Sequence, residues 1–227
     1  MTKLPTSAPG AFSFLPEELA ADLVSWSRPV RLQPNQILFS AGDPANGCYW
    51  IHEGFLKVAV EGQRGEQRIL AILGAGTLVG ESAVLDAAPR SASVSAIREA
   101  RLAHVTRTAF DSFADKHPVV FRHLAVLLMR RLRDVDEAMA ATSFLPLKGR
   151  VARILMVLAE AFGNDVGTGR VLIKHKINQS DVAAMAGIAR ENVNRILKEW
   201  AAQGLISRLA GYYCLEKKHE LEKQITL

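Results

Sequence analysis

Apolar and polar positions divide the chain into two patterns that meet near Thr106. Up to that residue, short apolar and β-branched runs alternate with turn residues, and glycines fall mostly between the runs. Turns at such short intervals predict a small barrel or sandwich. The predicted strands cover residues 36–40, 48–53, 55–60, 67–73, 92–97 and 101–105, and a helix is expected before them at 15–26.

After Thr106 the pattern changes to that of helices. A short helix is followed by a long one that begins at Pro118. Spacings of 4 and 3 alternate along the long helix through Phe121, Ala125, Leu128, Leu132, Val135, Met139 and Thr142. This heptad seam favours a helix that pairs with a second copy of the chain over one that packs only on its own domain. A helix over 118–142 would be roughly 37 Å long at ~1.5 Å per residue.

The sequence Phe144-Leu145-Pro146 interrupts the helical pattern, and a hinge is expected over 143–146. Proline fits the first turn of the following helix, where its missing N–H would have no partner anyway. That helix is predicted over 149–162. A glycine-rich loop over 163–169 and a strand over 171–177 are expected to follow.

Two short helices joined by a tight turn are predicted next. Asn178 is a good N-cap with Asp181 three residues on, and Ile177 and Val182 are spaced as a hydrophobic staple. Gly187 suits the end of the first helix, so that the pair forms a helix-turn-helix. The buried stripe of the second helix is expected at positions i, i+3, i+4 and i+7, which are Val193, Ile196, Leu197 and Trp200.

The opposite face of the second helix is polar. A solvated face with a Glu191–Arg195 pair at i, i+4 would account for it. The same residue types also suit the major groove, because arginine bonds guanine O6 and N7 and glutamate accepts from cytosine N4. Ala189 occupies the N-cap position, where Ser, Thr, Asp or Asn is usual. A hairpin around Ala210-Gly211 is a candidate wing.

Composition narrows the classes of protein. The net charge is +5, and residues 144–227 hold thirteen Lys and Arg against eight Asp and Glu, while the rest of the chain is balanced. This favours an anionic partner such as nucleic acid, although a solvated basic surface would have the same charge.

Cys48 and Cys214 form no CxxC pair, which argues against a disulfide framework, a zinc finger or an iron–sulfur cluster. Without a signal peptide or a membrane-length apolar run, a cytoplasmic protein is expected.

Residues 179–206, QSDVAAMAGIARENVNRILKEWAAQGLI, resemble the Crp/Fnr family of bacterial transcription regulators, in the branch of cyclic AMP receptor proteins. The family's recognition helix carries Arg-Glu-x-x-x-Arg, which Arg190, Glu191 and Arg195 match. The resemblance covers nearly the whole chain. It implies an α+β fold with an N-terminal β-roll (jelly roll) that senses an effector over 1–117, a dimerisation helix over 118–143 and a winged helix-turn-helix over 144–227.

Residues 80–94, GESAVLDAAPRSASV, resemble the phosphate-binding cassette of the same family. Arginine suits a cyclic phosphate, a serine hydroxyl adds a donor, and glutamate accepts from a ribose 2′-OH. A cassette that has lost its nucleotide remains the alternative. The effector contacts implied by the resemblance are Gly80, Glu81, Ser82, Arg90 and Ser91.

The chain departs from the family where the base would be contacted. A Thr-Ser pair of the family corresponds to Val135 and Asp136 here. Valine offers no hydrogen bond, whereas a carboxylate can accept two from guanine N1–H and N2–H. Cyclic AMP, cyclic GMP, another guanine nucleotide and no nucleotide therefore all stay open, and Asp136 is equally compatible with a place on the surface. No metal is expected.

The expected function is that of a homodimeric transcription regulator, not an enzyme, joined through residues 118–142. Its partners would be double-stranded DNA, as a palindrome with TGTGA-like half-sites, and RNA polymerase. Arg190 and Arg195 are expected on guanines and Glu191 on a cytosine. The other DNA contacts are expected from Gln179, Ser180, Asn192, Asn194 and Lys198.

Three alternatives differ in class. A regulator could act without nucleotide or sense haem or redox state through His52, His104, His117, His123 or Cys48, although their spacing matches no known site. An enzyme with a cyclic-nucleotide regulatory domain would need a catalytic domain, for which the residues after the hinge leave no room. A nucleoid-type protein would bind DNA regardless of sequence. The sequence does not distinguish an activator from a repressor.

Overall fold

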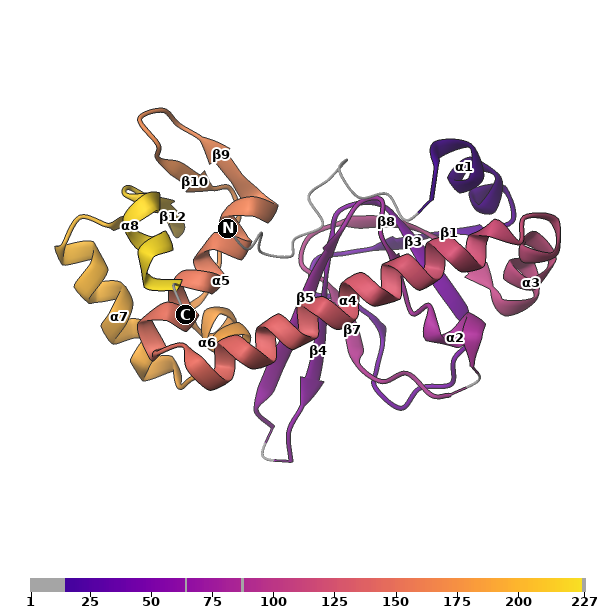
Figure 1. The fold of residues 1–227 in the computed structure, drawn as a ribbon, viewed down its shortest axis with the longest axis horizontal. Helices are drawn as coiled ribbons and strands as arrows, with labels where there is room; N and C mark the ends of the chain where they lie inside the picture. The colour runs from indigo at the N-terminus through magenta and orange to yellow at the C-terminus, as the bar shows by residue number, and fades with distance from the viewer. Residues whose placement is uncertain (1–14, 64, 87, 226–227) are drawn as a thin grey trace. The chain divides into compact units, whose positions relative to one another are not determined.

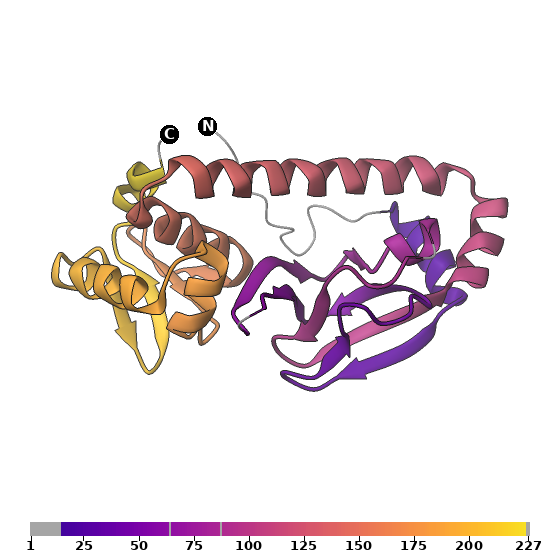
Figure 2. The same cartoon turned by 90° about the horizontal axis from the view of Figure 1, so that it is seen from below.

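The computed structural model describes residues 15–63, 65–86 and 88–225 (Figure 1). They form two compact units, divided between Leu132 and Arg133. The division falls inside α4 (Val119–Phe144), which Figure 2 shows as one continuous helix. The predicted α+β class, with a β-roll, a long helix and a helix-turn-helix, is confirmed. None of the described helices is long and apolar enough to cross a membrane.

The first unit is built from eight strands and the helices beside them. Two antiparallel four-stranded sheets have the orders β1-β8-β3-β6 and β2-β7-β4-β5. The strands are β1 (Arg28–Leu32), β2 (Ile37–Phe39), β3 (Gly47–Glu53), β4 (Phe55–Glu61), β5 (Gln67–Gly74), β6 (Leu78–Val79), β7 (Ser93–Ala96) and β8 (Ala100–Thr106). The helices are α1 (Glu17–Ser25), α2 (Ser82–Leu85), α3 (Arg107–Lys116) and the first part of α4.

Two hydrophobic clusters hold this unit together. One lies within the β-roll and includes Ile51, Leu56 and Leu102. The other joins the roll to its helices through Trp50, Phe110, Phe113 and Leu124, so that the start of α4 is fixed to the roll. The six predicted strands are present, with boundaries that differ by a few residues. Strands β1 and β6 were not predicted, because RPVRL contains a proline and two arginines and β6 has only two residues.

The second unit contains the C-terminal part of α4 and the elements after it. These are α5 (Leu147–Phe162), β9 (Gly163–Asp165), β10 (Val171–Ile173), α6 (Gln179–Ala186), α7 (Arg190–Ala202), β11 (Ile206–Leu209), β12 (Tyr212–Leu215), α8 (Lys218–Glu222) and a 3-10 turn, η1 (Lys223–Ile225). The four strands form one sheet in the order β11-β12-β10-β9.

Three boundaries in this unit correct the sequence prediction. The expected loop over 163–169 begins with strand β9, which pairs with β10. The expected strand over 171–177 ends at Ile173. The hinge is shorter than 143–146, because α4 continues through Phe144 and only Leu145 and Pro146 separate it from α5. The hydroxyl groups of Thr142 and Ser143 bond back to carbonyls one turn earlier, which is compatible with a helix that continues to this point.

The local signals of the helix-turn-helix are confirmed. The Asn178 side chain accepts a hydrogen bond of 2.7 Å from the backbone N–H of Asp181, and Ile177 and Val182 are both buried. Gly187 has φ +65°, a left-handed conformation that glycine adopts without a Cβ clash. Ala189 caps α7 without any side-chain hydrogen bond.

Candidate effector pocket and DNA-binding face

Arg90 of the predicted cassette is almost fully buried, with 4% of its surface exposed. Its Nη1 donates to the carbonyl of Gly80 (3.1 Å), and its Nη2 donates to the carbonyl of Gly47 (2.8 Å) and to Oδ1 of Asn46 (3.0 Å). The Phe39 ring lies beneath the guanidinium, with its centroid 4.1 Å from Cζ. The side chain is therefore held in one position by groups from several strands and loops.

The buried guanidinium forms no direct ion pair with a residue that the structure describes. Among the described residues, no carboxylate forms an ion pair with Arg90, and its Nε is buried without a hydrogen-bond partner. Burial lowers the pKa of Arg90, because removal from water disfavours the charged form. A cation in this position would be stabilised by an anion, and a phosphate is one that arginine binds well.

Aromatic side chains continue away from Arg90. Tyr49 lies 6.0 Å from Phe39 and stacks on the His104 ring, with centroids 4.6 Å apart. Burial, followed by the charge of Arg90, lowers the pKa of His104. His104 is therefore a neutral ring that supports Tyr49, and the cationic centre of this cluster is Arg90.

Glu81 lies directly after Gly80 and pairs with Arg131 of α4 through its Oε1. A second guanidinium nitrogen of Arg131 donates to the carbonyl of Leu78. The other carboxylate oxygen of Glu81, Oε2, is buried and has no hydrogen-bond partner among the described residues. Glu81 thus keeps one free acceptor, as an incoming hydroxyl group would require. Arg131 was not among the predicted site residues, because its partner lies fifty positions away in the sequence.

The remaining cassette residues differ in exposure. Gly80 has φ +73°, and a Cβ added there would collide with the Arg90 guanidinium. Ser82 begins α2 and is half-buried, whereas Ser91 is exposed. Gly80, Glu81 and Arg90 are joined by the contacts above, while no hydrogen bond of the Ser82 or Ser91 side chain is found within the described residues.

Val135 and Asp136 lie on α4 in the second unit, and both are exposed. Val135 is 61% exposed and belongs to the predicted seam, of which Phe121, Leu132 and Met139 are also 49–65% exposed. The Phe121 ring also meets the edge of Phe110, at 6.1 Å between centroids. Apolar side chains this exposed along one helix are typical of a surface that packs against another molecule. The contact of Val135 and Asp136 with the base of an effector stays a prediction.

The polar face of α7 presents four charged side chains to solvent. Arg190, Glu191, Arg195 and Lys198 are exposed, opposite a fully buried stripe of Val193, Ile196, Leu197 and Trp200. The possible Glu191–Arg195 pair is not formed among the described residues, where Arg195 donates instead to Oδ1 of Asn192 (3.2 Å). Glu191 is left with its carboxylate unpaired within the described residues.

The predicted flanking contacts lie around the same face. Gln179 of α6 donates to Oδ1 of Asn194 on α7 (3.4 Å), which joins the two helices of the motif. Ser180 is exposed at the start of α6. From α5, Lys148 reaches Glu199 of α7 at 2.5 Å, and this contact lowers the pKa of the Glu199 carboxyl. These two contacts join α6 and α5 to α7.

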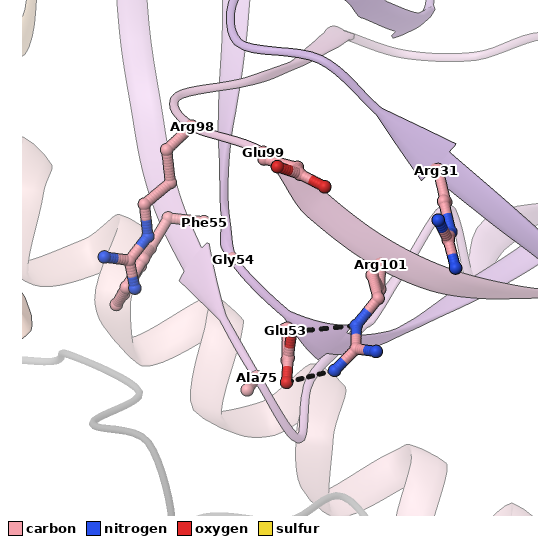
Figure 3. Close-up of a pocket in the computed structure, with 8 residues that line it drawn as sticks. All are labelled: Arg31, Glu53, Gly54, Phe55, Ala75, Arg98, Glu99 and Arg101. Atoms are coloured by element: carbon pink, nitrogen blue, oxygen red, sulfur yellow. Dashed lines mark hydrogen bonds and ion pairs between the residues drawn. The ribbon is translucent and has the colours of Figure 1, made fainter.

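A separate hollow of about 510 Å³ lies on the β-roll, and none of the predicted site residues lines it (Figure 3). Arg31 and Arg101 are cross-strand partners there, and Arg101 forms an ion pair with Glu53. Arg98 stacks on the Phe55 ring at 4.5 Å. Exposed charges of both signs indicate a solvated surface rather than a site for the effector.

The residues considered for haem or redox sensing do not converge. His52, His104, His117 and His123 lie on different elements, and no group of three or more potential metal ligands occurs in the described part of the chain. His117 contacts Asp22 at 2.7 Å. Burial raises the pKa of the Cys48 thiol to about 12, so that the thiol stays protonated and unreactive.

Known protein families match both the β-roll and the helix-turn-helix unit. The cyclic nucleotide-binding domain family matches residues 29–117, and the Crp-like helix-turn-helix domain family matches residues 149–224. A CRP-like cAMP-activated global transcriptional regulator of Mycobacterium tuberculosis is 32% identical over 202 residues, which is 89% of each chain. The cyclic AMP receptor protein of Thermus thermophilus is 33% identical over 84% of each chain.

The fold also has solved counterparts. The c-di-GMP responsive global regulator CLP of Xanthomonas campestris superposes with a TM-score of 0.77 at 22% identity, over 88% of this chain and 99% of that one. The matched domains and relatives are those of transcription regulators, so the protein is not an enzyme. The chain belongs to the Crp/Fnr family of DNA-binding transcription regulators.

Proposed function

We propose that the protein is a homodimeric regulator whose affinity for a DNA palindrome is controlled by a cyclic nucleotide bound in the β-roll. The observation that carries the effector part is Arg90, a buried guanidinium that Gly47 and Asn46 hold and that pairs with no carboxylate among the described residues. Arg90 and Ser91 would bind the cyclic phosphate, and Gly80, Glu81 and Ser82 would border the phosphate and ribose. Relatives described as cAMP-activated support a cyclic nucleotide as the effector.

The identity of the base is a separate part of the proposal. Val135 and Asp136 are proposed to face the base, where Asp136 favours guanine over adenine through two acceptor oxygens. Cyclic GMP is therefore as good a candidate as cyclic AMP. A pocket that binds no nucleotide is the competing function, and the departure at Val135 and Asp136 is the observation that favours it.

Isothermal titration calorimetry of the nucleotide-free dimer with cyclic AMP, cyclic GMP and cyclic di-GMP tests the effector. Saturable heat with a cyclic mononucleotide supports the proposal, and stronger binding of cyclic GMP supports the role of Asp136. Absence of heat with all three would falsify control by a cyclic nucleotide. Binding of cyclic di-GMP alone would assign a different effector to the protein.

Dimerisation is proposed to occur through α4, because its exposed seam repeats every 3.5 residues on average. Two recognition helices would then lie about 34 Å apart, one turn of DNA.

Arg190 and Arg195 would contact guanines and Glu191 a cytosine, as in TGTGA-like half-sites. Gln179, Ser180, Asn192, Asn194 and Lys198 would contact phosphates or flanking positions. Contact with RNA polymerase and a place in the cytoplasm beside the DNA follow from this role.

Selection of binding sites from random DNA tests the assignment of α7. Arg195→Ala should lose roughly 1–3 kcal/mol per half-site and relax the preference at one base position. Lys198→Ala is the matched control, since loss of a phosphate contact lowers affinity for all sequences alike. An unchanged motif for Arg195→Ala would show that this arginine does not read a base.

A further inference from the structure

The seam of α4 gives every residue of this helix a position in the heptad. Leu132 and Met139 occupy position a, and Leu128 and Val135 occupy position d, as the alternating 3 and 4 spacings require. Arg131 then falls at position g and Asp136 at position e. These are the two positions that flank the seam and form ion pairs between helices in coiled coils.

A parallel pair of helices brings specific g and e positions together. Each g residue lies beside the e residue five positions further along the other helix. The dimer of the proposed function is parallel about α4, because both helix-turn-helix motifs must lie at the same end to read one palindrome. Arg131 of one subunit therefore faces Asp136 of the other, and the two-fold axis creates this pair twice.

The other g and e pairs within α4 carry no charge. Leu124 and Met129 hold one such pair of positions, and Ala138 and Ser143 hold the other. Arg131 and Asp136 are thus the one charged g–e pair along the described helix, in a position where an ion pair can fix the alignment of the two helices. Asp136 is exposed and has no hydrogen bond or ion pair within the described part of its own chain.

Arg131 is also the residue that holds Glu81 of the effector pocket. It binds Glu81 and the carbonyl of Leu78 through its two terminal nitrogens, and 26% of its side chain remains exposed. A guanidinium has five N–H donors, and these two contacts leave others free. The same cation can therefore contact a carboxylate on each side.

We propose that, in the effector-free dimer, Asp136 of each subunit pairs with Arg131 of the other subunit. This inference rests on the proposed homodimer and deepens it. Glu81, Arg131 and Asp136 of the second subunit would form one chain of charges from a pocket to the opposite helix. An effector that binds Glu81 through its ribose and Asp136 through its base competes for both ends of this chain. Effector binding and the strength of the dimer are then linked.

A double-mutant cycle on the dissociation constant of the effector-free dimer tests the pair, with sedimentation equilibrium as the measurement. Asp136→Asn should weaken the dimer by about two- to thirtyfold, since an exposed ion pair contributes about 0.2–1 kcal/mol and the dimer contains two. Arg131→Gln should weaken it as well, and the double variant should be no weaker than Arg131→Gln alone. The effect of Asp136→Asn should shrink at high salt.

Two further variants serve as controls for position and for charge. Glu137→Gln removes a carboxylate one residue along, at a position that faces away from the seam, and should leave the dimer unchanged. Asp136→Glu keeps the charge at an exposed position and should retain most of the dimer affinity of the wild type.

Three results would overturn the pair. Additive effects in the double variant, or a dimer that Asp136→Asn leaves unchanged, would do so while the proposed homodimer stands. In the second case, a lower affinity of Asp136→Asn for cyclic GMP would assign Asp136 to the base alone. A wild-type chain that stays monomeric would overturn the proposed dimer and the pair together.

Discussion

At the scale of single residues, Arg90 differs from Arg101, another arginine of the β-roll. Arg101 is exposed and pairs with Glu53, whereas Arg90 is buried over Phe39 and bonds backbone carbonyls and the Asn46 side chain. Partial negative charges on carbonyl oxygens compensate a buried cation only in part. The cyclic phosphate of the proposed function would supply the remaining negative charge beside Arg90.

Replacement of Arg90 by Met should abolish most of the effector affinity while the fold remains. Methionine has a similar length and can pack on Phe39, but it offers no donor to a phosphate. Loss of hydrogen bonds to a charged group is worth about 1.5–3 kcal/mol, or about 10- to 150-fold in affinity. Calorimetry measures the loss, with Arg101→Met as the control at the surface. Unchanged affinity would show that the phosphate lies elsewhere.

His104 predicts how stability depends on pH. Its pKa in the folded protein is lowered by burial and then by Arg90, whereas the unfolded chain has the ordinary value of about 6.5. Between the two values the unfolded state binds more protons, so the contribution of His104 is complete above about pH 6.5 and is lost as pH falls through the folded pKa. Urea unfolding at pH 7.5 and 5.5 measures the free energy of unfolding. Its decrease from pH 7.5 to 5.5 should be smaller for His104→Phe than for the wild type. His52→Gln changes an exposed histidine and serves as the control. An equal decrease in the free energy of unfolding for His104→Phe and the wild type would contradict the role of His104 in the pH dependence.

At the scale of elements, α6 and α7 were predictable because their signals are local. The Asn178 cap, the left-handed Gly187 and the buried stripe that ends at Trp200 lie within 23 residues, and each acts on its neighbours in sequence. Strands β1 and β9 were missed for the opposite reason. The sequences RPVRL and GND have weak strand preference, and pairing with β8 and β10 determines their conformation.

The cap of α7 offers a test of this local reasoning. Ala189 has φ −65° and ψ 145°, the extended conformation from which a serine side chain can accept a backbone N–H. Ala189→Ser should stabilise the protein by about 0.5–2 kcal/mol in chemical denaturation. The matched variant Ala189→Val has no side-chain acceptor and is as poor an N-cap as alanine, so it should not reproduce the gain. A serine variant no more stable than wild type would mean that the first turn of α7 is already satisfied.

At the scale of the whole molecule, the order of parts along the chain could be predicted, but several contacts of the site could not. Gly80, Glu81 and Arg90 were predicted from one short motif, and they lie together in the structure. Residues that hold them, such as Asn46 beside Arg90 and Arg131 beside Glu81, lie 44 and 50 positions away and became visible only in the fold. Contacts across such distances leave no periodic signal in a single sequence.

The proposed regulation requires a link between the two units. The β-roll with its cassette lies in one unit, the helix-turn-helix lies in the other, and α4 contributes to both. An effector can alter DNA affinity only if it binds one arrangement of the dimer more tightly than another. The difference between the two affinities sets how strongly the protein can respond.

Fluorescence anisotropy of a labelled palindrome with TGTGA half-sites one helical turn apart, measured with and without cyclic nucleotide at fixed salt, tests this control most directly. The proposed function predicts that cyclic AMP or cyclic GMP raises the affinity of the wild type at least tenfold, and that Arg90→Met binds the same DNA without any response. A scrambled duplex should stay at the weaker, effector-independent affinity. Equal affinity for the palindrome with and without either nucleotide would contradict effector control, and equal affinity for the scrambled duplex would contradict sequence-specific binding.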